Sequence, residues 1–181
     1  TVSGLKAQAT PLPCGQCLHC RINKHREMKN RILLENMAHE ESTFATLTYD
    51  EKHLPTNGCL HLPHLQKMWK RLRKNKDIPK FRYFAVGEYG DTGQRPHYHA
   101  AIFGIGTALA PILERYWGLG FIKCLPINKD TASYIAGYTL KKLTRKDDSR
   151  LNGRTPEFFT GSKLEGGIGV KGIEHIVEKI K

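Results

Sequence analysis

Two histidines one residue apart, His97 and His99, begin an apolar run in GEYGDTGQRPHYHAAIFG, residues 87–104. Side chains alternate along a strand, so both imidazoles are expected on one face while Tyr98 points to the other. If the segment folds back as a hairpin, Glu88 lies opposite His97 and shares that face. One carboxylate oxygen and two imidazole nitrogens suit Mg²⁺ or Mn²⁺ and leave positions for water or a substrate oxygen. A chance pair among the 9 histidines of the chain is the alternative interpretation.

A second chemical pattern is the pair of tyrosines in SYIAGYTLKKL, residues 133–143. On a helix that turns about 100° per residue, the hydroxyl and cationic side chains form one stripe, opposite the apolar ones. This stripe comprises Tyr134, Tyr138, Lys141 and Arg145. A tyrosine hydroxyl can attack a phosphodiester to give a covalent phosphotyrosine, and a neighbouring lysine favours the phenolate. Two half-buried aromatic residues without chemistry are the alternative.

Three cysteines crowd into PCGQCLHCR near the start of the chain. Cys14, Cys17 and Cys20 have CxxCxxC spacing, and a CxxC pair supplies half of a zinc site. Cys59 could complete the site in three dimensions; structural thiols or a DNA-contact segment are the alternatives. The total of 5 cysteines is odd, which argues against a disulfide framework and indicates a reducing, cytosol-like compartment.

The chain is strongly basic, with 29 Lys+Arg against 17 Asp+Glu and a net charge of +12. Such a charge favours a polyanionic partner, most often nucleic acid. The segment QKMWKRLRKNK, residues 66–76, concentrates this charge on a predicted helix. We expect phosphate contacts from Lys67, Lys70, Arg71, Arg73, Lys74 and Arg145. A solvated helix face is the alternative. No run of 18 apolar residues is present, so no membrane helix is predicted.

The elements that must position these residues follow from hydrophobic periodicity. Helices are predicted over 18–41, 62–76, 109–117 and 130–143. Strands are predicted over 44–49, 81–88, 97–104 and 121–127, with a hairpin from 81 to 104. This order predicts the α+β class, with a central antiparallel sheet flanked by helices. A single domain is expected: a Cys-rich lead-in and basic helix (14–41), a catalytic core (42–145) and an extension (146–181) without assigned elements.

Together these residues resemble the HUH endonucleases, the initiators of rolling-circle replication. The name denotes a His–hydrophobe–His motif, here His97-Tyr98-His99. The strand motif FATLTY (44–49), the histidine strand and the helix with tyrosine and lysine follow in the family's order. The stretches PLPCGQCLHCR, GEYGDTGQRPHYH and YIAGYTLKK are similar to those of replication initiators from gokushovirus-type microviruses, which are small single-stranded DNA phages. The resemblance covers residues 11 to about 145.

This resemblance implies an RRM-like, ferredoxin-like core with the histidine pair in a central strand and the tyrosine helix beside it. It implies Mg²⁺ or Mn²⁺ held by His97, His99 and a third polar residue, a role we give to Glu88. It implies a site-specific nick in single-stranded origin DNA that leaves a 5′-phosphotyrosine and a free 3′-OH. Tyr134 and Tyr138 would alternate as nucleophiles, with Lys141 nearby.

The resemblance also implies a setting for the reaction. No helicase-like phosphate loop is visible in the sequence, so a host helicase would unwind the DNA and a host polymerase would extend the 3′-OH. The place of action would be the cytoplasm of a bacterial host.

Three other functions are compatible with parts of the pattern. A transposase or relaxase would share the HUH chemistry, but paired tyrosines favour the replication initiator. A non-catalytic, zinc-stabilised nucleic-acid-binding module would bind DNA without needing either tyrosine. A structural zinc protein would need Cys14 and Cys17 to fold but not the histidines.

Overall fold

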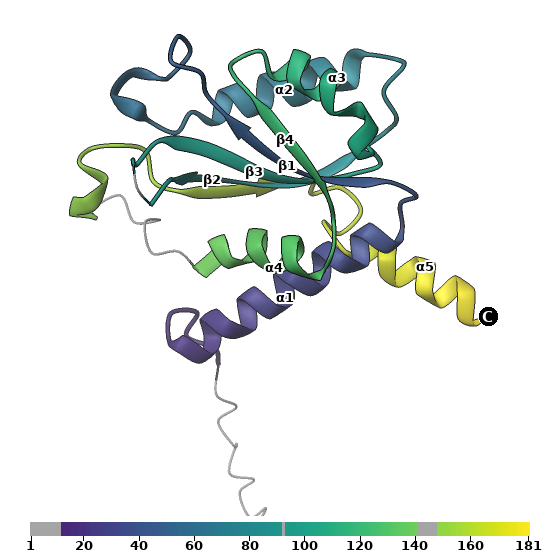
Figure 1. Cartoon of the computed structure of the whole chain (residues 1–181). Helices are drawn as coiled ribbons and strands as arrows, with labels where there is room; N and C mark the ends of the chain where they lie inside the picture. The colour runs from purple at the N-terminus through teal and green to yellow at the C-terminus, as the bar shows by residue number, and fades with distance from the viewer. Residues whose placement is uncertain (1–11, 92, 141–147) are drawn as a thin grey trace, which may run out of the picture.

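Five antiparallel strands form one sheet in the order β4-β1-β3-β2-β5, with helices on both faces (Figure 1). The computed structural model describes residues 12–91, 93–140 and 148–181. The strands are β1 (Ser42–Thr48), β2 (Arg82–Tyr89), β3 (Pro96–Phe103), β4 (Ile122–Pro126) and β5 (Phe158–Gly161). The helices are α1 (Leu18–Met37), α2 (Leu62–Lys74), α3 (Ala110–Trp117), α4 (Lys129–Gly137) and α5 (Val170–Ile180). The predicted α+β class is confirmed.

The β2–β3 hairpin occupies the middle of the sheet and carries the histidines. Its strands are rich in β-branched and aromatic residues, which pack well on a pleated surface. Gly90 N–H donates to the Arg95 carbonyl oxygen at 3.1 Å and so closes the turn. In the resulting register, Glu88 pairs with His97 and Val86 pairs with His99, as the sequence predicted for Glu88.

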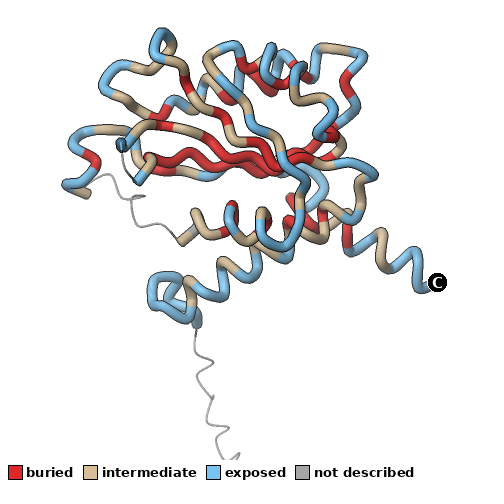
Figure 2. Tube along the Cα trace, viewed as in Figure 1, coloured by how far each residue is buried: buried red, intermediate tan, exposed pale blue. Residues whose placement is uncertain are grey.

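Two hydrophobic cores lie on opposite faces of the sheet, because successive side chains of each strand point to opposite sides. Tyr98 packs on one face among the buried residues of α2 and α3, including Trp69 and Trp117. Phe44 and Ala101 pack on the other face with residues of α1 and α4. Figure 2 shows the central strands as the most continuously buried part of the chain. His97 and His99 therefore belong to the face that α1 and α4 cover.

The helix predicted over residues 130–143 is shorter in the structure. Helix α4 ends at Gly137 and a 3-10 turn follows over Tyr138–Leu140. Glycine is a poor helix former, which explains why the α-helical period stops there. The start of α4 is well specified, because the Asn128 side chain accepts from the Thr131 N–H at 2.9 Å and the Thr131 hydroxyl accepts the Asn128 N–H in return.

Other boundaries differ less from the sequence prediction. Helix α1 ends at Met37 rather than residue 41, and each of the first four strands shifts by one or two residues at its ends. No helix among the described residues is long and apolar enough to cross a membrane.

The C-terminal segment, left unassigned from sequence, contributes to the same sheet. Strand β5 pairs antiparallel with β2, and α5 packs against α1. A Cβ on Gly172 would lie 1.9 Å from the Leu34 carbonyl oxygen, so this helix contact requires glycine. A strand of 4 residues with a terminal glycine has too little alternation to be recognised in a sequence.

A buried ion pair fixes α1 against the sheet. The Glu35 carboxylate is fully buried, lies 2.9 Å from Arg82 Nε on β2, and accepts the Gly169 N–H at 2.7 Å. Burial alone would raise the Glu35 pKa, but hydrogen bonds from His39 and Gly169 and the charge of Arg82 outweigh it, so the pKa is lowered. The pair thereby joins α1, β2 and the segment before α5.

Removing one partner of this pair should destabilise the fold strongly. We expect Glu35→Ala to lower the free energy of unfolding by about 3–5 kcal/mol, because Arg82 would keep a buried, unpaired charge. The double variant Glu35→Met/Arg82→Met should recover much of that loss. Since folding lowers the Glu35 pKa, the contribution is present above the unfolded pKa of about 4.3 and is lost as the pH falls through the folded pKa. Urea denaturation at pH 7 and pH 3 measures both effects; additive losses in the double variant would contradict this account.

Candidate metal and tyrosine site

Three side chains of the β2–β3 hairpin converge on one point. Glu88 Oε1 lies 2.7 Å from His97 Nε2 and 3.0 Å from His99 Nε2. The carboxylate and His99 are almost fully buried, and His97 is half-buried. The three candidate ligand atoms all lie within 4.8 Å of one another. We call Glu88, His97 and His99 the hairpin triad.

The remaining ring nitrogens of both histidines are held by the surrounding backbone and strands. His97 Nδ1 donates to the Arg95 carbonyl oxygen at 3.1 Å, and His99 Nδ1 is hydrogen-bonded to Thr46 Oγ1 at 3.0 Å. A carbonyl oxygen only accepts, so the His97 proton is on Nδ1 and Nε2 faces the carboxylate as the ligand atom. Such outer contacts orient histidine ligands in metal sites.

The donor set of the hairpin triad fits a divalent cation. It offers one carboxylate oxygen and two imidazole nitrogens from a rigid hairpin, and its outer side opens on a pocket of about 820 Å³. The pocket is lined by Glu88, Gly90, Asp91, His97, Asp130, Ser133, Tyr134, Gly137 and Tyr138. A cation held there would retain open positions toward this pocket.

Both tyrosines reach the hairpin triad from the end of α4. The Tyr134 ring meets the His99 ring edge-on at 5.1 Å, and the Tyr138 ring stacks on it at 5.2 Å with a 9° interplanar angle. The two tyrosine rings are 5.1 Å apart. Tyr134 is 52% exposed, whereas Tyr138 is half-buried and packs partly against the core. The spacing of four residues thus places both hydroxyl-bearing side chains at one pocket.

The electrostatics around Tyr138 oppose ionisation in the metal-free arrangement. Burial raises the pKa of its phenol, and the neighbouring Tyr134 and Glu88 side chains raise it further. The sequence predicted the opposite direction, on account of Lys141. Lys141 and Arg145 lie outside the described residues. Of the groups described, the Glu88 carboxylate is the negative charge that disfavours the phenolate.

Several residues at this site were not singled out from the sequence. Phe44 on β1 stacks on His99 at 5.6 Å, so the imidazole lies parallel to both Phe44 and Tyr138. Asp91 and Asp130 bring further carboxylates to the pocket. The pairing of Thr46 with His99 contains the signal for Phe44, because residues two apart on β1 share a face. No sequence pattern indicated the two aspartates.

The cysteine cluster forms a second candidate metal site. Sulfur atoms of Cys14, Cys17 and Cys20 lie within 4.8 Å of one another at the exposed start of α1. Hydrogen bonds from the Cys17 and Gln16 backbones lower the pKa of Cys14 to about 7, which favours the thiolate that binds metal. Among the described residues, Cys59 is not a member of this cluster. Its neighbour Leu60 packs in the core with α2, on the opposite face of the sheet from α1.

The predicted DNA-contact residues of α2 do not lie at the hairpin triad. The buried side of α2, with Leu65 and Trp69, packs on the Tyr98 face. Its exposed basic residues are Lys67, Lys70, Arg71, Arg73 and Lys74. Arg71 donates to the Tyr116 carbonyl oxygen, and Arg73 lies 5.1 Å from the Phe81 ring centroid. Any DNA contact of this helix is therefore made away from the pocket.

Helix α1 supplies the basic residues on the face of the hairpin triad. Lys24 lines a small cavity together with Glu88 and Tyr138. Arg21 donates to the Leu140 carbonyl oxygen, and His25 Nε2 is 3.0 Å from the Ser133 carbonyl oxygen. These bonds tie α1 to the segment that carries both tyrosines.

The comparison with known families agrees with this site. Residues 42–143, more than half of the chain, match the family of the replication-associated protein ORF2. The chain belongs to this family. The matched range contains the hairpin triad and both tyrosines, while the cysteine cluster precedes it. The resemblance to phage replication initiators is thereby confirmed.

Curated relatives from this group are phage proteins. The chain is 30% identical to replication-associated protein VP4 of Bdellovibrio phage phiMH2K, over 75% of this chain and 50% of that protein. It is 32% identical to replication-associated protein ORF2 of Spiroplasma virus 4, over 88% of this chain and 56% of that protein. The chain spans about half the length of the curated relatives it matches. No solved structure matches it.

Binding of a divalent cation by the hairpin triad should stabilise the fold. We expect MnCl₂ at about 100 times its Kd to add about 2.7 kcal/mol to the free energy of unfolding relative to EDTA. His97→Ala should abolish this Mn²⁺-induced rise in Tm, because it removes a ligand. Asp130→Asn, a carboxylate outside the triad, is the matched control and should keep it. Equal rises in Tm for wild type and His97→Ala would contradict the assignment.

Zinc should bind at the cysteine cluster and not at Cys59. We expect about one zinc ion per chain after purification under reducing conditions, little zinc in Cys17→Ser, and an unchanged content in Cys59→Ser. Affinity should fall as the pH drops below about 7, because the Cys14 thiolate is then protonated. Elemental analysis measures the zinc content. Equal losses in Cys17→Ser and Cys59→Ser would refute the cluster as the site.

Proposed function

We propose that this chain is a metal-dependent endonuclease and strand transferase that initiates rolling-circle replication on single-stranded DNA through a 5′-phosphotyrosine. The observation that carries the proposal is the contact of both tyrosine rings with His99, whose Nε2 faces Glu88. Nucleophile and cation ligands therefore open on the same pocket.

The proposed reaction is a transesterification. The hydroxyl oxygen of one tyrosine attacks phosphorus, the bond from phosphorus to the 3′ oxygen breaks, and the released 3′ oxygen takes up a proton. The 5′ phosphate stays bound to the tyrosine, so the energy of the phosphodiester is retained and the strand can be rejoined without ATP. When bound, Mg²⁺ or Mn²⁺ would offset the Glu88 charge and polarise the scissile phosphate.

The chain's own residues have separate tasks in this scheme. Glu88, His97 and His99 hold the cation and orient it through the rigid hairpin. Phe44 and Tyr138 fix the plane of the His99 ring between them. Tyr134 and Tyr138 offer two hydroxyls to one pocket, so one can hold a 5′ end while the other attacks. We assign Lys141 the role of a cation beside the nucleophiles, as the resemblance implies.

The substrate we propose is single-stranded origin DNA. A net charge of +12 and Lys24 beside the pocket favour phosphate contacts. The free 3′-OH would prime a host polymerase, with strands separated by a host helicase. Because the relatives are phage proteins, we place the reaction in the cytoplasm of a bacterial host.

A non-catalytic nucleic-acid-binding module is the second candidate. The raised Tyr138 pKa favours it, since a tyrosine that resists ionisation is a poor nucleophile in the metal-free arrangement. The two candidates differ in one product, the covalent link between protein and DNA.

A covalent-adduct assay separates the candidates. We expect wild-type protein with Mn²⁺ and a labelled single-stranded library of candidate origins to give an adduct that survives denaturing electrophoresis. EDTA should abolish it, Tyr134→Phe and Tyr138→Phe should each retain part of it, and the double variant should have none, because both nucleophiles are then absent. Tyr116→Phe, on the opposite face of the sheet, is the matched control and should behave as wild type. DNA binding without an adduct on any substrate would favour the binding module.

A further inference from the structure

We propose that a pocket beside the hairpin triad binds an unpaired nucleobase of the substrate strand, with the Phe159 ring as its stacking surface. The inference rests on the proposed function, because it takes single-stranded DNA as the ligand. It adds a binding site on β5 and α1 to the metal and tyrosine site on the hairpin and α4.

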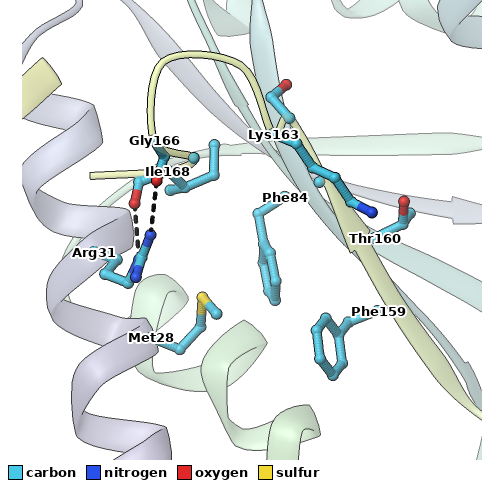
Figure 3. Close-up of a pocket in the computed structure, with 11 residues that line it drawn as sticks. Met28, Arg31, Phe84, Phe159, Thr160, Lys163, Gly166 and Ile168 are labelled. Carbon is cyan, nitrogen blue, oxygen red and sulfur yellow. Dashed lines mark hydrogen bonds between the residues drawn. The ribbon is translucent and has the colours of Figure 1, made fainter. Parts of the chain in front are cut away.

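The pocket lies where α1 faces the β2–β5 edge of the sheet (Figure 3). It has a volume of about 440 Å³, and the segment 162–168 forms one wall. Its apolar surface comes from Met28, Phe84, Phe159 and Ile168. Figure 3 shows the side chains of Met28, Phe84 and Phe159 turned toward the same space. An apolar lining with polar groups at the rim is typical of sites for planar organic ligands.

Phe159 is placed as a stacking ring rather than as a core residue. It is 49% exposed, whereas Phe84 below it is buried, and the two ring centroids are 6.1 Å apart with a 34° tilt. One side of the Phe159 ring is thus supported by the protein while much of its surface remains accessible. Nucleobases stack on such exposed rings with little dependence on sequence.

Strand register connects this pocket to the hairpin triad. Val86 on β2 pairs with His99 on one side and with Phe159 on the other, so all three share one face. Two strand spacings correspond to about 10 Å between the His99 and Phe159 backbones. A small cavity between them is lined by Glu88, Tyr138 and Phe159 among others. One DNA strand could therefore pass from the scissile phosphate to the Phe159 ring without leaving this face.

Positive charges suited to phosphates flank the ring. Lys24 Nζ lies 5.5 Å from the Phe159 ring centroid, and the Lys163 side chain extends toward Thr160 at the rim (Figure 3). Within the described ranges, neither lysine forms an ion pair with an acidic residue. Arg31 has a different task, because it donates to the Ile168 carbonyl oxygen at 2.8 Å and to the Gly166 carbonyl oxygen at 3.4 Å. It shapes the wall, while the two lysines face the solvent where a backbone would run.

The combination favours a nucleotide strand over an apolar protein segment. An apolar segment would gain from the Phe159 ring but would bury Lys24 and Lys163 without partners, which is costly. A nucleotide offers a flat base to the ring and an anionic phosphate to the lysines. The site would hold the strand beside the nick and so position the scissile phosphate.

The test measures binding apart from chemistry. Fluorescence anisotropy in EDTA compares wild type, Phe159→Leu and Phe159→Trp for a labelled oligothymidine of about 12 nucleotides and for an abasic oligomer of equal length. Leucine keeps the apolar packing on Phe84 but removes the ring, and tryptophan keeps a ring. We expect Phe159→Leu to bind oligothymidine about tenfold more weakly, Phe159→Trp to bind it at least as tightly as wild type, and all three proteins to bind the abasic oligomer equally.

Lys24→Ala tests the charge component, with Lys70→Ala on α2 as the matched control on the opposite face. We expect only Lys24→Ala to weaken binding of the abasic oligomer and to reduce the salt dependence by about one phosphate contact. Unchanged thermal unfolding of each variant shows that it folds.

The proposal is overturned if Phe159→Leu and wild type bind oligothymidine equally, if both oligomers lose affinity equally, or if wild type does not bind oligothymidine. Loss of the base-dependent effect with a normal covalent adduct would remove this pocket and leave the proposed function. A base-dependent effect without any adduct would keep the pocket and remove the catalytic function.

Discussion

The pairing register of the β2–β3 hairpin is the constraint on which the site depends. Glu88 faces the two histidines because it pairs with His97, and a shift of one residue would move its side chain to the opposite face. The Gly90–Arg95 turn and the apolar packing of both strand faces hold this register. The neighbouring strands then place Phe44 and Phe159 on the same face as His99, so one register sets the cation ligands, the ring that orients them and the proposed base pocket.

Burial of the hairpin triad has an electrostatic consequence for the tyrosines. Glu88 is almost fully buried beside Tyr138, and together burial and this carboxylate raise the phenol pKa. A carboxylate that is useful as a cation ligand is therefore unfavourable to the nucleophile until its charge is balanced. This arrangement couples the proposed strand attack to cation binding. Tyr134, which is more exposed, gives the pocket a second hydroxyl in a different environment.

The sequence predicted the parts of this site that follow from local periodicity. Alternation along a strand places His97 with His99, hairpin pairing adds Glu88, and a spacing of four residues brings Tyr134 and Tyr138 to one side. It did not predict long-range placement: which face of the sheet α2 would cover, that Cys59 would lie apart from the cysteine cluster, or that Phe159 would extend the sheet beyond β2. These outcomes depend on packing between distant segments, which leaves no periodic signal. The end of α4 at Gly137 was missed because the apolar pattern continues past it.

The central claim is that Glu88, His97 and His99 form one divalent-cation site at the tyrosine pocket. Its most direct test is a crystal structure of the chain soaked with Mn²⁺, with anomalous diffraction data to locate the metal. The account predicts an anomalous peak within coordination distance of Glu88 Oε1 and of Nε2 of both histidines, open toward Tyr134 and Tyr138. A peak bound only by Asp91 and Asp130, or no peak at the triad when Mn²⁺ saturates the protein in solution, would contradict it.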